Sequence, residues 1–352
     1  MAFLENLKLA QEMVEQKYIY CQHHPEAPLL LWSYSKSAQM DKVWNPATCA
    51  CRGIITTEDY QIVARPFGKF WNIEEITDKS QIPEEPFEVF EKLDGSLGIL
   101  YWIGDNPYIT TKGSFTSDQG THATRILREK YLEATMKLDR SKTYLFEIIW
   151  PEDHHCVQYG DLDDIFLIAV RDTETGTEYD IREYASNFKI PKIYDGIKDY
   201  RGIREIYSGE NREGFVVKFK SGYRLKMKYE SYFRIHFLKS MLSEKTIFAF
   251  ILAGEESKAL ETMKDLDEEN QIHFMKIYEE LKSEYSRVEL EALRLAEHII
   301  NTCGHWHEGA KPSRELLELV KASEYSDILF RMLKGKPYRE NILKWQKHKR
   351  NL

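Results

Sequence analysis

The sequence has few of the features that direct a protein into a membrane or out of the cell. Its 352 residues contain no apolar run of about 18 or more, and no apolar segment typical of secretion signals follows the N-terminus. We therefore expect neither a membrane span nor export. Cysteine is scarce, and its five residues form no Cys-x-x-Cys pair and no disulfide-like spacing. This pattern predicts reduced thiols in a cytosolic protein.

An excess of positive charge and a glycine-rich nucleotide loop are also missing. The formal net charge is −8, so any surface that binds nucleic acid must be a local patch. The absence of a Walker or Rossmann glycine pattern argues against the common mononucleotide and dinucleotide folds. By contrast, 42% hydrophobic and 13% aromatic residues suffice for a sizeable core, and the length favours two domains.

The first part of the chain predicts an α+β domain built on antiparallel sheets. Residues 1 to about 25 carry apolar side chains at helical spacing and predict an amphipathic helix. From about residue 30 to 235, short β-prone runs alternate with turns, and two helical patches interrupt them around 121–137 and 180–188. This mixture differs from a regular βαβ alternation. We place the boundaries of this domain at residues 1–238.

The remaining residues, 239–352, predict an all-α domain. Segments 244–300 and 313–348 are rich in Leu, Glu, Lys and Ala, with a break at Gly304 and Pro312. The last segment is basic and surrounds two aromatic residues, Tyr338 and Trp345. It either contacts nucleic-acid phosphates or forms a solvated terminal helix. Its basic residues are Lys334, Lys336, Arg339, Lys344, Lys347, Lys349 and Arg350.

One pentapeptide, Lys92-Leu93-Asp94-Gly95-Ser96, has the residues that covalent chemistry on a phosphate needs. It offers a lysine nucleophile, a carboxylate two residues later on the same strand face, and a glycine without a Cβ to obstruct a phosphate. A Lys-x-Asp-Gly match arises by chance in roughly one chain in ten of this length. The alternative is a strand that ends in an Asp-Gly turn. The meaning of the motif therefore depends on what accompanies it.

Three further patterns supply what a reactive lysine needs. Glu147 ends an alternating run and could bring a carboxylate to a pocket, while Glu213 precedes an apolar strand that could cover a base. Lys226 and Lys228 alternate and therefore point to one face of a strand. Near a third lysine they would bind phosphates and depress the pKa of the attacking amine. Each could singly be an ordinary strand residue, but their joint occurrence in this order argues for one site.

The ordered motifs resemble those of the covalent nucleotidyltransferase superfamily, which includes ATP-dependent ligases and capping enzymes. The closer resemblance is to the RNA ligase 1 family typified by the bacteriophage T4 enzyme. In that family Lys-x-Asp-Gly is motif I, the Glu147 segment motif III, Glu-Gly motif IV and Lys-x-Lys motif V. Segments 32–34, 51–54, 64–72 and 111–115 resemble further family elements. The resemblance covers roughly residues 30–235 and departs at Trp71, where the family usually has Phe.

The resemblance implies a role for each matched residue. Lys92 would be the nucleophile that carries AMP, and its implied catalytic partners are Asp94, Glu147, Glu213, Lys226 and Lys228. The implied nucleotide contacts are Tyr34, Arg52, Lys69, Glu91, Lys92, Gly95, Lys112, Glu147, Val217, Lys226 and Lys228. Mg²⁺, or Mn²⁺ in its place, would be held by Glu147 and Glu213 through water, with Glu256 as a further candidate. Tyr232 is implied as an accessory or RNA-contacting residue.

The implied function is ATP-dependent RNA ligation in three steps. Lys92 takes AMP from ATP, the AMP passes to an RNA 5′-phosphate, and a 3′-hydroxyl then displaces it. The implied partner is single-stranded or broken-loop RNA, including tRNA, with no membrane or obligate protein partner. The expected location is the cytoplasm, or the host cytoplasm for a phage-encoded member. Three alternatives stay open: a DNA ligase, a GTP-dependent capping enzyme and a non-catalytic RNA-binding relative. The first two usually carry an OB-fold domain in the region where this sequence predicts helices.

Two segments rich in Cys and His are weak candidates for a metal site or a catalytic role. Cys303-Gly304-His305-Trp306-His307 lacks the ligand spacing of zinc fingers. The segment His154-His155-Cys156 predicts packing or a loop lining.

Overall fold

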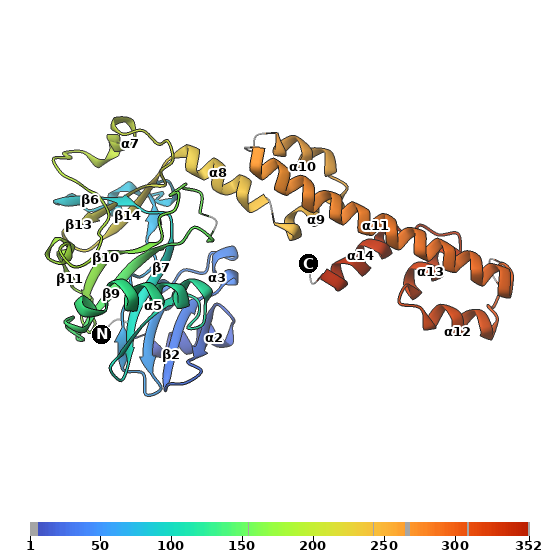
Figure 1. Ribbon diagram of the computed structural model, residues 1–352, viewed down its shortest axis with the longest axis horizontal. Coiled ribbons are helices and arrows are strands. Elements are labelled where there is room, and N and C mark those ends of the chain that lie inside the picture. The colour runs from blue at the N-terminus through green and yellow to red at the C-terminus, as the bar shows by residue number, and fades with distance from the viewer. Residues whose placement is uncertain (1–5, 154, 242, 265–267, 308–309, 351–352) are drawn as a thin grey trace. The chain divides into compact units, whose positions relative to one another are not determined.

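Three β-sheets form the framework of the N-terminal part of the chain (Figure 1). The computed structural model describes residues 6–153, 155–241, 243–264, 268–307 and 310–350. The chain divides into two units, residues 1–233 and residues 234–352. The first unit combines the sheets with short helices, and the described parts of the second are helical. This confirms the predicted α+β fold followed by an all-α region.

The first sheet has the antiparallel order β1-β2-β3-β4. Its strands are β1 (Ile19–His23), β2 (Leu29–Tyr34), β3 (Arg52–Thr57) and β4 (Ile62–Ala64), and its helices are α2 (Leu7–Glu15), α3 (Lys36–Met40) and α4 (Pro46–Ala50). The prediction of one helix to about residue 25 is wrong. The helix ends at Glu15, Lys17 turns the chain with a φ of 64°, and β1 then pairs with β2. Pairing along a neighbouring strand therefore overrides the local helical spacing.

The second sheet is buried on both faces. Its order is β11-β10-β9-β7-β8. The strands are β7 (Ser96–Ile103), β8 (Asn106–Thr111), β9 (Lys142–Ile149), β10 (Asp164–Asp172) and β11 (Glu178–Tyr179). Helix α5 (Asp118–Lys130), which α6 (Leu132–Met136) follows, packs its apolar side on one face, and the first sheet packs on the other. The second predicted helical patch forms only the short 3-10 turn Ile181–Tyr184.

The third sheet has one apolar and one polar face. Its order is β12-β6-β13-β14-β5, with β5 parallel to β14. The strands are β5 (Trp71–Asn72), β6 (Phe87–Lys92), β12 (Ile193–Tyr194), β13 (Gly214–Phe219) and β14 (Arg224–Lys228), and the short helix α7 (Ile203–Ile206) lies between β12 and β13 in the chain. Val89, Phe215, Val217 and Met227 lie in a buried core on one face. Because side chains alternate along a strand, the intervening residues face the opposite side.

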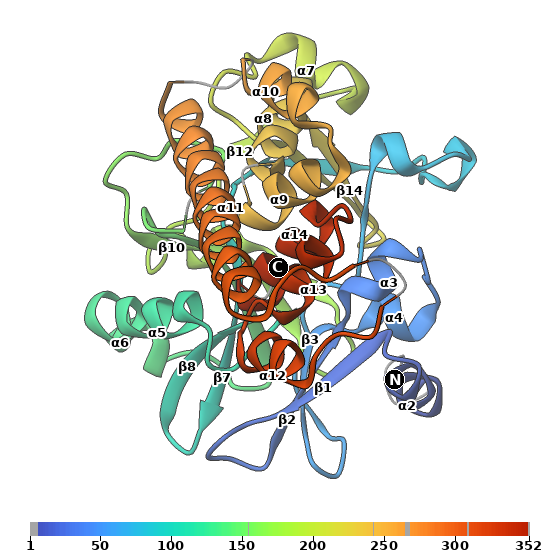
Figure 2. The same cartoon turned by 90° about the vertical axis from the view of Figure 1, so that its right-hand side faces the viewer.

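The C-terminal unit is built along one long helix, α11 (Glu268–Cys303). The helices that follow β14 are, besides α11, α8 (Glu230–Met241), α9 (Glu244–Ala253), α10 (Glu256–Met263), α12 (Arg314–Ala322), α13 (Ser326–Leu333) and α14 (Arg339–Arg350). Helices α9, α12, α13 and α14 pack against α11, and Figure 2 shows α9, α13 and α14 beside it. In the described ranges, none of the helices combines the length and the apolar character that crossing a bilayer requires.

Candidate active site

A cavity of about 470 Å³ in the N-terminal unit gathers most of the residues that the sequence indicated. Those that line it are Arg52, Glu91, Lys92, Gly95, Lys112, Glu147, Glu213, Lys226 and Lys228. Five others lie outside the lining, namely Tyr34, Lys69, Asp94, Val217 and Tyr232. Glu256 belongs to the helical unit. A volume of this size is ordinary for a small-molecule site.

The register of the third sheet arranges the residues of its cavity-facing side in three rows. Each row takes one residue from β6, one from β13 and one from β14. The rows are Lys92–Gly214–Lys228, then Phe90–Val216–Lys226, then Glu88–Lys218–Arg224. A Cβ at Gly214, where φ is +147°, would collide with the backbone of β14. Glycine at this position therefore allows the strands to approach beside Lys92.

At one end of the cavity a buried carboxylate joins two lysines. Glu213 is 3% exposed, and its two oxygens each lie 2.8 Å from a lysine Nζ, one from Lys92 and one from Lys228. Lys92 donates a hydrogen bond to Oε2 of Glu213. Both lysines retain access to the cavity through long flexible stems. The Glu213 carboxylate thus binds two lysines, and an anion that entered the cavity could compete with it for them.

The pKa of Lys92 is opposite in direction to our expectation. Burial lowers this pKa, but Glu213 and then Glu147 raise it more, and the net shift is upward. The expectation of a depressed pKa for this amine is therefore wrong. The neighbouring lysines would lower the pKa, but the tertiary structure also brings two carboxylates to the amine, and these raise it.

The cation with a depressed pKa is Lys226. Burial, followed by the nearby charges of Arg52, Lys92 and Lys228, lowers the pKa of Lys226 to about 7. Its Nζ lies 4.6 Å from the centre of the Phe70 ring. Lys226 is therefore poised to gain a proton when an anion enters the cavity.

Glu147 supports the loop that follows Lys92. Its Oε1 accepts a hydrogen bond from the backbone N–H of Gly95 at 3.0 Å. Burial raises the pKa of the Glu147 carboxyl to about 7, against the lowering influence of Lys92. A Cβ at Gly95 would collide with the carbonyl of Ile148, so this glycine is required for close packing against β9.

Asp94 organises the loop rather than contacting Lys92. It lies beyond the end of β6, so it does not share a strand face with Lys92 as we had predicted. Its Oδ2 accepts hydrogen bonds from the backbone N–H groups of Cys156 and Val157, at 2.6 and 3.0 Å. Its Oδ1 accepts from the Tyr232 hydroxyl at 2.8 Å. These bonds join the motif to residues distant in the sequence.

An aromatic and cationic group lies beside the cavity. The Nζ of Lys69 is 4.2 Å from the ring centre of Trp44 and 4.0 Å from that of Trp71. Lys112 donates to the Tyr34 hydroxyl at 3.4 Å. Burial raises the pKa of Tyr34, but Lys112 and Arg52 lower it more, so the net shift is downward. Sequence reasoning missed Trp44, because it stands in no motif.

The apolar wall of the cavity corrects the prediction for Val217. Val217 is fully buried in the core on the other face of the sheet, whereas its neighbour Val216 lines the cavity. Side chains alternate between the two faces of a strand, as they do at Lys226 and Lys228, so Val216 and Val217 must lie on opposite faces of the sheet. The apolar lining residues are Phe67, Phe70, Phe90, Leu93, Leu97, Ile168, Pro191 and Val216. Phe67 and Phe70 stand in the segment that carries Lys69, so the motif itself could have indicated them.

Glu256 lies within an ion-pair network of the helical unit. It accepts hydrogen bonds from Tyr278 at 2.9 Å, Lys282 at 3.0 Å and Arg339 at 3.2 Å. Burial raises its pKa, but the Lys282 and Tyr278 hydrogen bonds and both cations lower it more, so the net shift is downward. Its role as a metal ligand stays a prediction.

The basic C-terminal segment is partly neutralised inside the same unit. Arg339 pairs with Glu256, Lys349 with Glu324, and Arg350 with Glu244 and Glu284. Within the described ranges, no three His, Cys, Asp or Glu side chains gather closely enough to hold a metal ion, and this includes the segment 303–307. His154 lies outside the described residues.

Sequence comparisons with known proteins match this chain to RNA ligases. A family model described as RNA ligase matches residues 50–237, more than half of the chain. A protein of Autographa californica nuclear polyhedrosis virus, named as a putative bifunctional polynucleotide kinase/RNA ligase, is 26% identical over 263 residues. That match covers 66% of this chain, which spans only 37% of the length of the viral relative.

Two solved structures resemble this chain at low identity. An archaeal ATP-dependent RNA ligase is 15% identical, covers 80% of this chain and 79% of its own, and gives a TM-score of 0.49. A variant of Naegleria gruberi RNA ligase with ATP and Mn is 21% identical, with a coverage of 48% of this chain and 57% of that chain and a TM-score of 0.38.

Proposed function

This chain belongs to the RNA ligase family, and we propose that it is an ATP-dependent RNA ligase that works through a lysyl-AMP intermediate on Lys92. The observation that carries the proposal is the surroundings of the Lys92 amine. It lies in a cavity next to one buried carboxylate, with Lys226, Lys228 and Arg52 in the same lining. Phosphoryl transfer depends on positioning and on the neutralisation of charge, which such a lining supplies.

The first step joins AMP to the protein. The Lys92 Nζ lone pair forms a bond to the α-phosphorus of ATP, the bond to the bridging oxygen breaks, and pyrophosphate leaves. The ammonium must first lose a proton, and the Glu213 carboxylate at 2.8 Å is placed to accept it. Lys226 and Lys228 would offset the charge of the α-phosphate. Arg52 would contact the outgoing phosphates, because its Nη1 is buried without a hydrogen-bond partner in the described part of the chain.

Glu147 and Glu213 would hold a divalent cation, Mg²⁺ or Mn²⁺, through its waters. Both carboxylates line the cavity, and oxygen ligands suit these ions. The Glu213 oxygens already contact two lysines, which favours a contact through water over a direct one. The bound ion would supply additional neutralisation of the phosphate charge.

The apolar row of the cavity suits a nucleobase. Phe90 and Val216 occupy the row next to Lys92, and Phe67 and Phe70 complete an aromatic wall. A base placed there would bring the α-phosphate to the lysine end of the cavity. In the later steps AMP passes to the 5′-phosphate of an RNA, and the 3′-hydroxyl of an RNA end displaces AMP to form the phosphodiester.

The first step is tested by labelling with α-labelled ATP and Mg²⁺ or Mn²⁺. We expect label that stays on the wild type in denaturing gel electrophoresis, and none on Lys92→Ala. The matched control is Lys198→Ala, which changes an exposed lysine outside the cavity and should keep the label. Label that survives Lys92→Ala would refute the intermediate. Label from GTP but not from ATP would instead favour a capping enzyme.

For the substrate we propose single-stranded or broken-loop RNA, including a tRNA cleaved in its anticodon loop. The family membership and the name of the viral relative support an RNA substrate. Ligation of broken tRNA, linear single-stranded RNA and nicked DNA duplexes should be compared with the full chain. Preference for the DNA nick would contradict the proposal, and RNA binding without either labelling or ligation would favour a non-catalytic relative.

A further inference from the structure

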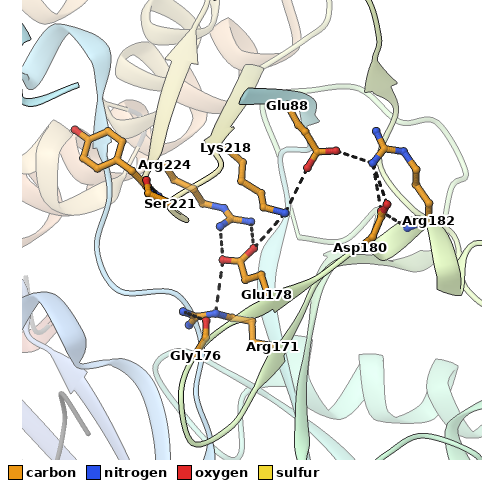
Figure 3. A network of polar contacts seen from close by, with 10 residues as sticks. Glu88, Arg171, Gly176, Glu178, Asp180, Arg182, Lys218, Ser221 and Arg224 are labelled. Carbon is orange, nitrogen blue, oxygen red and sulfur yellow. Dashed lines mark hydrogen bonds and ion pairs between the residues drawn. The ribbon is translucent and has the colours of Figure 1, made fainter. Parts of the chain in front are cut away.

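A second buried carboxylate lies at the other end of the same sheet face. Glu178 of β11 is 9% exposed and binds the 8%-exposed Arg224 of β14 through both guanidinium nitrogens (Figure 3). The Nη2–Oε2 distance is 2.6 Å. Two further cations approach Glu178, with Arg171 Nε at 3.7 Å and Lys218 Nζ at 3.8 Å. This ion pair joins the second sheet to the third.

The pair separates the nucleotide cavity from its neighbours. Arg224 lines the cavity that contains Lys92 and also a smaller one of about 230 Å³. Glu178 lines the smaller cavity and a third one of about 560 Å³, but not the first. The Arg224 guanidinium also lies over the Phe67 ring, 4.3 Å from its centre. Phe67 and Phe70 also line both the first cavity and the smaller one, so the Arg224–Glu178 pair and these two rings form the partition at this side of the first cavity.

The distance along the sheet suits the length of a nucleotide. Lys92 and Arg224 stand in the first and third rows, so along the strand direction they are four residues apart, or about 13 Å, and they also lie two strands apart, on β6 and β14. If Lys92 meets the α-phosphate and the base covers the apolar row, the ribose lies between them. A purine is attached to ribose at N9, and its N1/C6 edge therefore points away from Lys92. That edge meets the partition.

We propose that Arg224, held by Glu178, forms the end wall of the base site and restricts which purine nucleotide Lys92 accepts. This inference rests on the proposed function. Arg224 is the residue that limits the depth of the cavity, and Glu178 is a positioning residue that acts through it. A guanidinium that makes two parallel bonds to a carboxylate and packs on an aromatic ring has a fixed orientation, so it resists displacement better than a lysine would.

The test enlarges the cavity by mutation and measures whether the protein then accepts a larger nucleotide. The double variant Arg224→Ala with Glu178→Ala removes both charges, which avoids leaving either one buried and unpaired. Lysyl-adenylate formation is measured with ATP and with N6-benzyl-ATP. The wild type should prefer ATP strongly, and in the double variant this preference should fall at least tenfold, within the range of steric discrimination by a pocket. An unchanged preference in a folded double variant would overturn the proposal.

The matched control is Glu88→Gln. Glu88 pairs with Lys218 and Arg182 in the same network, but it neither contacts Arg224 nor lines the cavity. It should keep the wild-type preference, and an equal loss of preference in this variant would also overturn the proposal. Should the double variant fail to fold, Glu178→Gln removes only the charge that holds Arg224 in place. A less firmly held Arg224 should lower the preference for ATP over N6-benzyl-ATP several-fold, and an unchanged preference would contradict the inference.

Failure of the underlying function gives a different result. If the wild type itself takes no label from ATP, or if the label does not depend on Lys92, the proposed function is wrong. If the wild type is labelled at Lys92 and the variants keep its nucleotide preference, only the end-wall inference is wrong.

Discussion

Two buried glutamates lie among cations, Glu213 in the lining of the cavity that contains Lys92 and Glu178 behind its Arg224 wall, and these cations differ in kind. Glu213 contacts Lys92 and Lys228, which are 18% and 17% exposed. Glu178 contacts Arg224, which is 8% exposed and bound through two nitrogens. Lysine is a mobile point charge, whereas arginine presents a rigid planar fork. We infer that the first cluster can exchange its carboxylate for a phosphate, while the second holds its shape.

The difference shows how similar charge clusters can serve chemistry or architecture. At the Lys92 end the carboxylate raises the pKa of the amine that we propose as the nucleophile. At the Arg224 end the carboxylate fixes the wall that separates neighbouring cavities. Four changes test this contrast, and we describe them from the largest expected effect to the smallest.

Glu213→Gln should slow lysyl-adenylate formation at saturating ATP by about 100-fold or more. The amide cannot accept the Lys92 proton and no longer attracts Lys228. Single-turnover labelling with α-labelled ATP measures the rate. Glu178→Gln is the matched control and should stay within a few-fold of wild type at saturating ATP. If both variants lost the same factor in labelling rate, the two glutamates would not differ in function as we infer.

Glu178→Gln should lower the free energy of unfolding by about 3 kcal/mol, because it leaves the buried Arg224 without its charged partner. Glu213→Gln should cost less, about 1 kcal/mol, since the two lysines can turn their ammonium groups toward the cavity. Urea denaturation of both variants gives the comparison. A larger loss of unfolding free energy in Glu213→Gln would contradict our inference that the Arg224 end is the more rigid one.

The third prediction concerns the protonation of Lys226, which lies in the row between the two ends. Its pKa of about 7 means that it is mostly neutral at pH 8 in the free protein. A bound phosphate favours the ammonium and raises this pKa, so ATP binding at pH 8 should take up about one proton at this site. Calorimetry in two buffers of different ionisation enthalpy measures the uptake. Lys226→Arg stays charged at this pH and should lower the uptake, whereas an unchanged value would assign the proton to another group.

Tyr232→Phe should have the smallest effect. It removes one hydrogen bond to Asp94 and should lower the free energy of unfolding by about 1 kcal/mol. Tyr200→Phe, in a tyrosine that packs against Phe87 and Phe219, is the control and should change stability by less than about 0.5 kcal/mol. Equal effects would show that the Tyr232 hydroxyl contributes nothing specific to the Lys92 loop.

The sequence predicted the candidate site best where the chemistry lies on alternating strands. Lys226 and Lys228 share a face because side chains alternate, and the same rule would have selected Arg224 and Val216. Val217 was chosen in place of Val216, although a one-residue shift moves a side chain to the opposite face. The prediction for Asp94 failed for a related reason, because β6 ends at Lys92.

The fold was predictable in class and less so in its local boundaries. Hydrophobic periodicity separated the sheet-rich region from the helical one, because each pattern buries apolar side chains in only one way. It failed at residues 19–23, where pairing with β2 makes a strand. Glu178 was missed because β11 is two residues long and belongs to no motif.

The sequence by itself determined the class of fold, the RNA ligase family and most of the charged side chains of the cavity, since motifs and strand alternation are local properties. Only the tertiary structure decided which carboxylate meets which cation. Glu213 reaches Lys92 across 121 positions of the chain, and Glu178 reaches Arg224 across 46. Sheet pairing makes these contacts, and they set the pKa direction of Lys92 and the depth of the cavity. Charge acts through distance in space, which the order of residues along a chain does not specify.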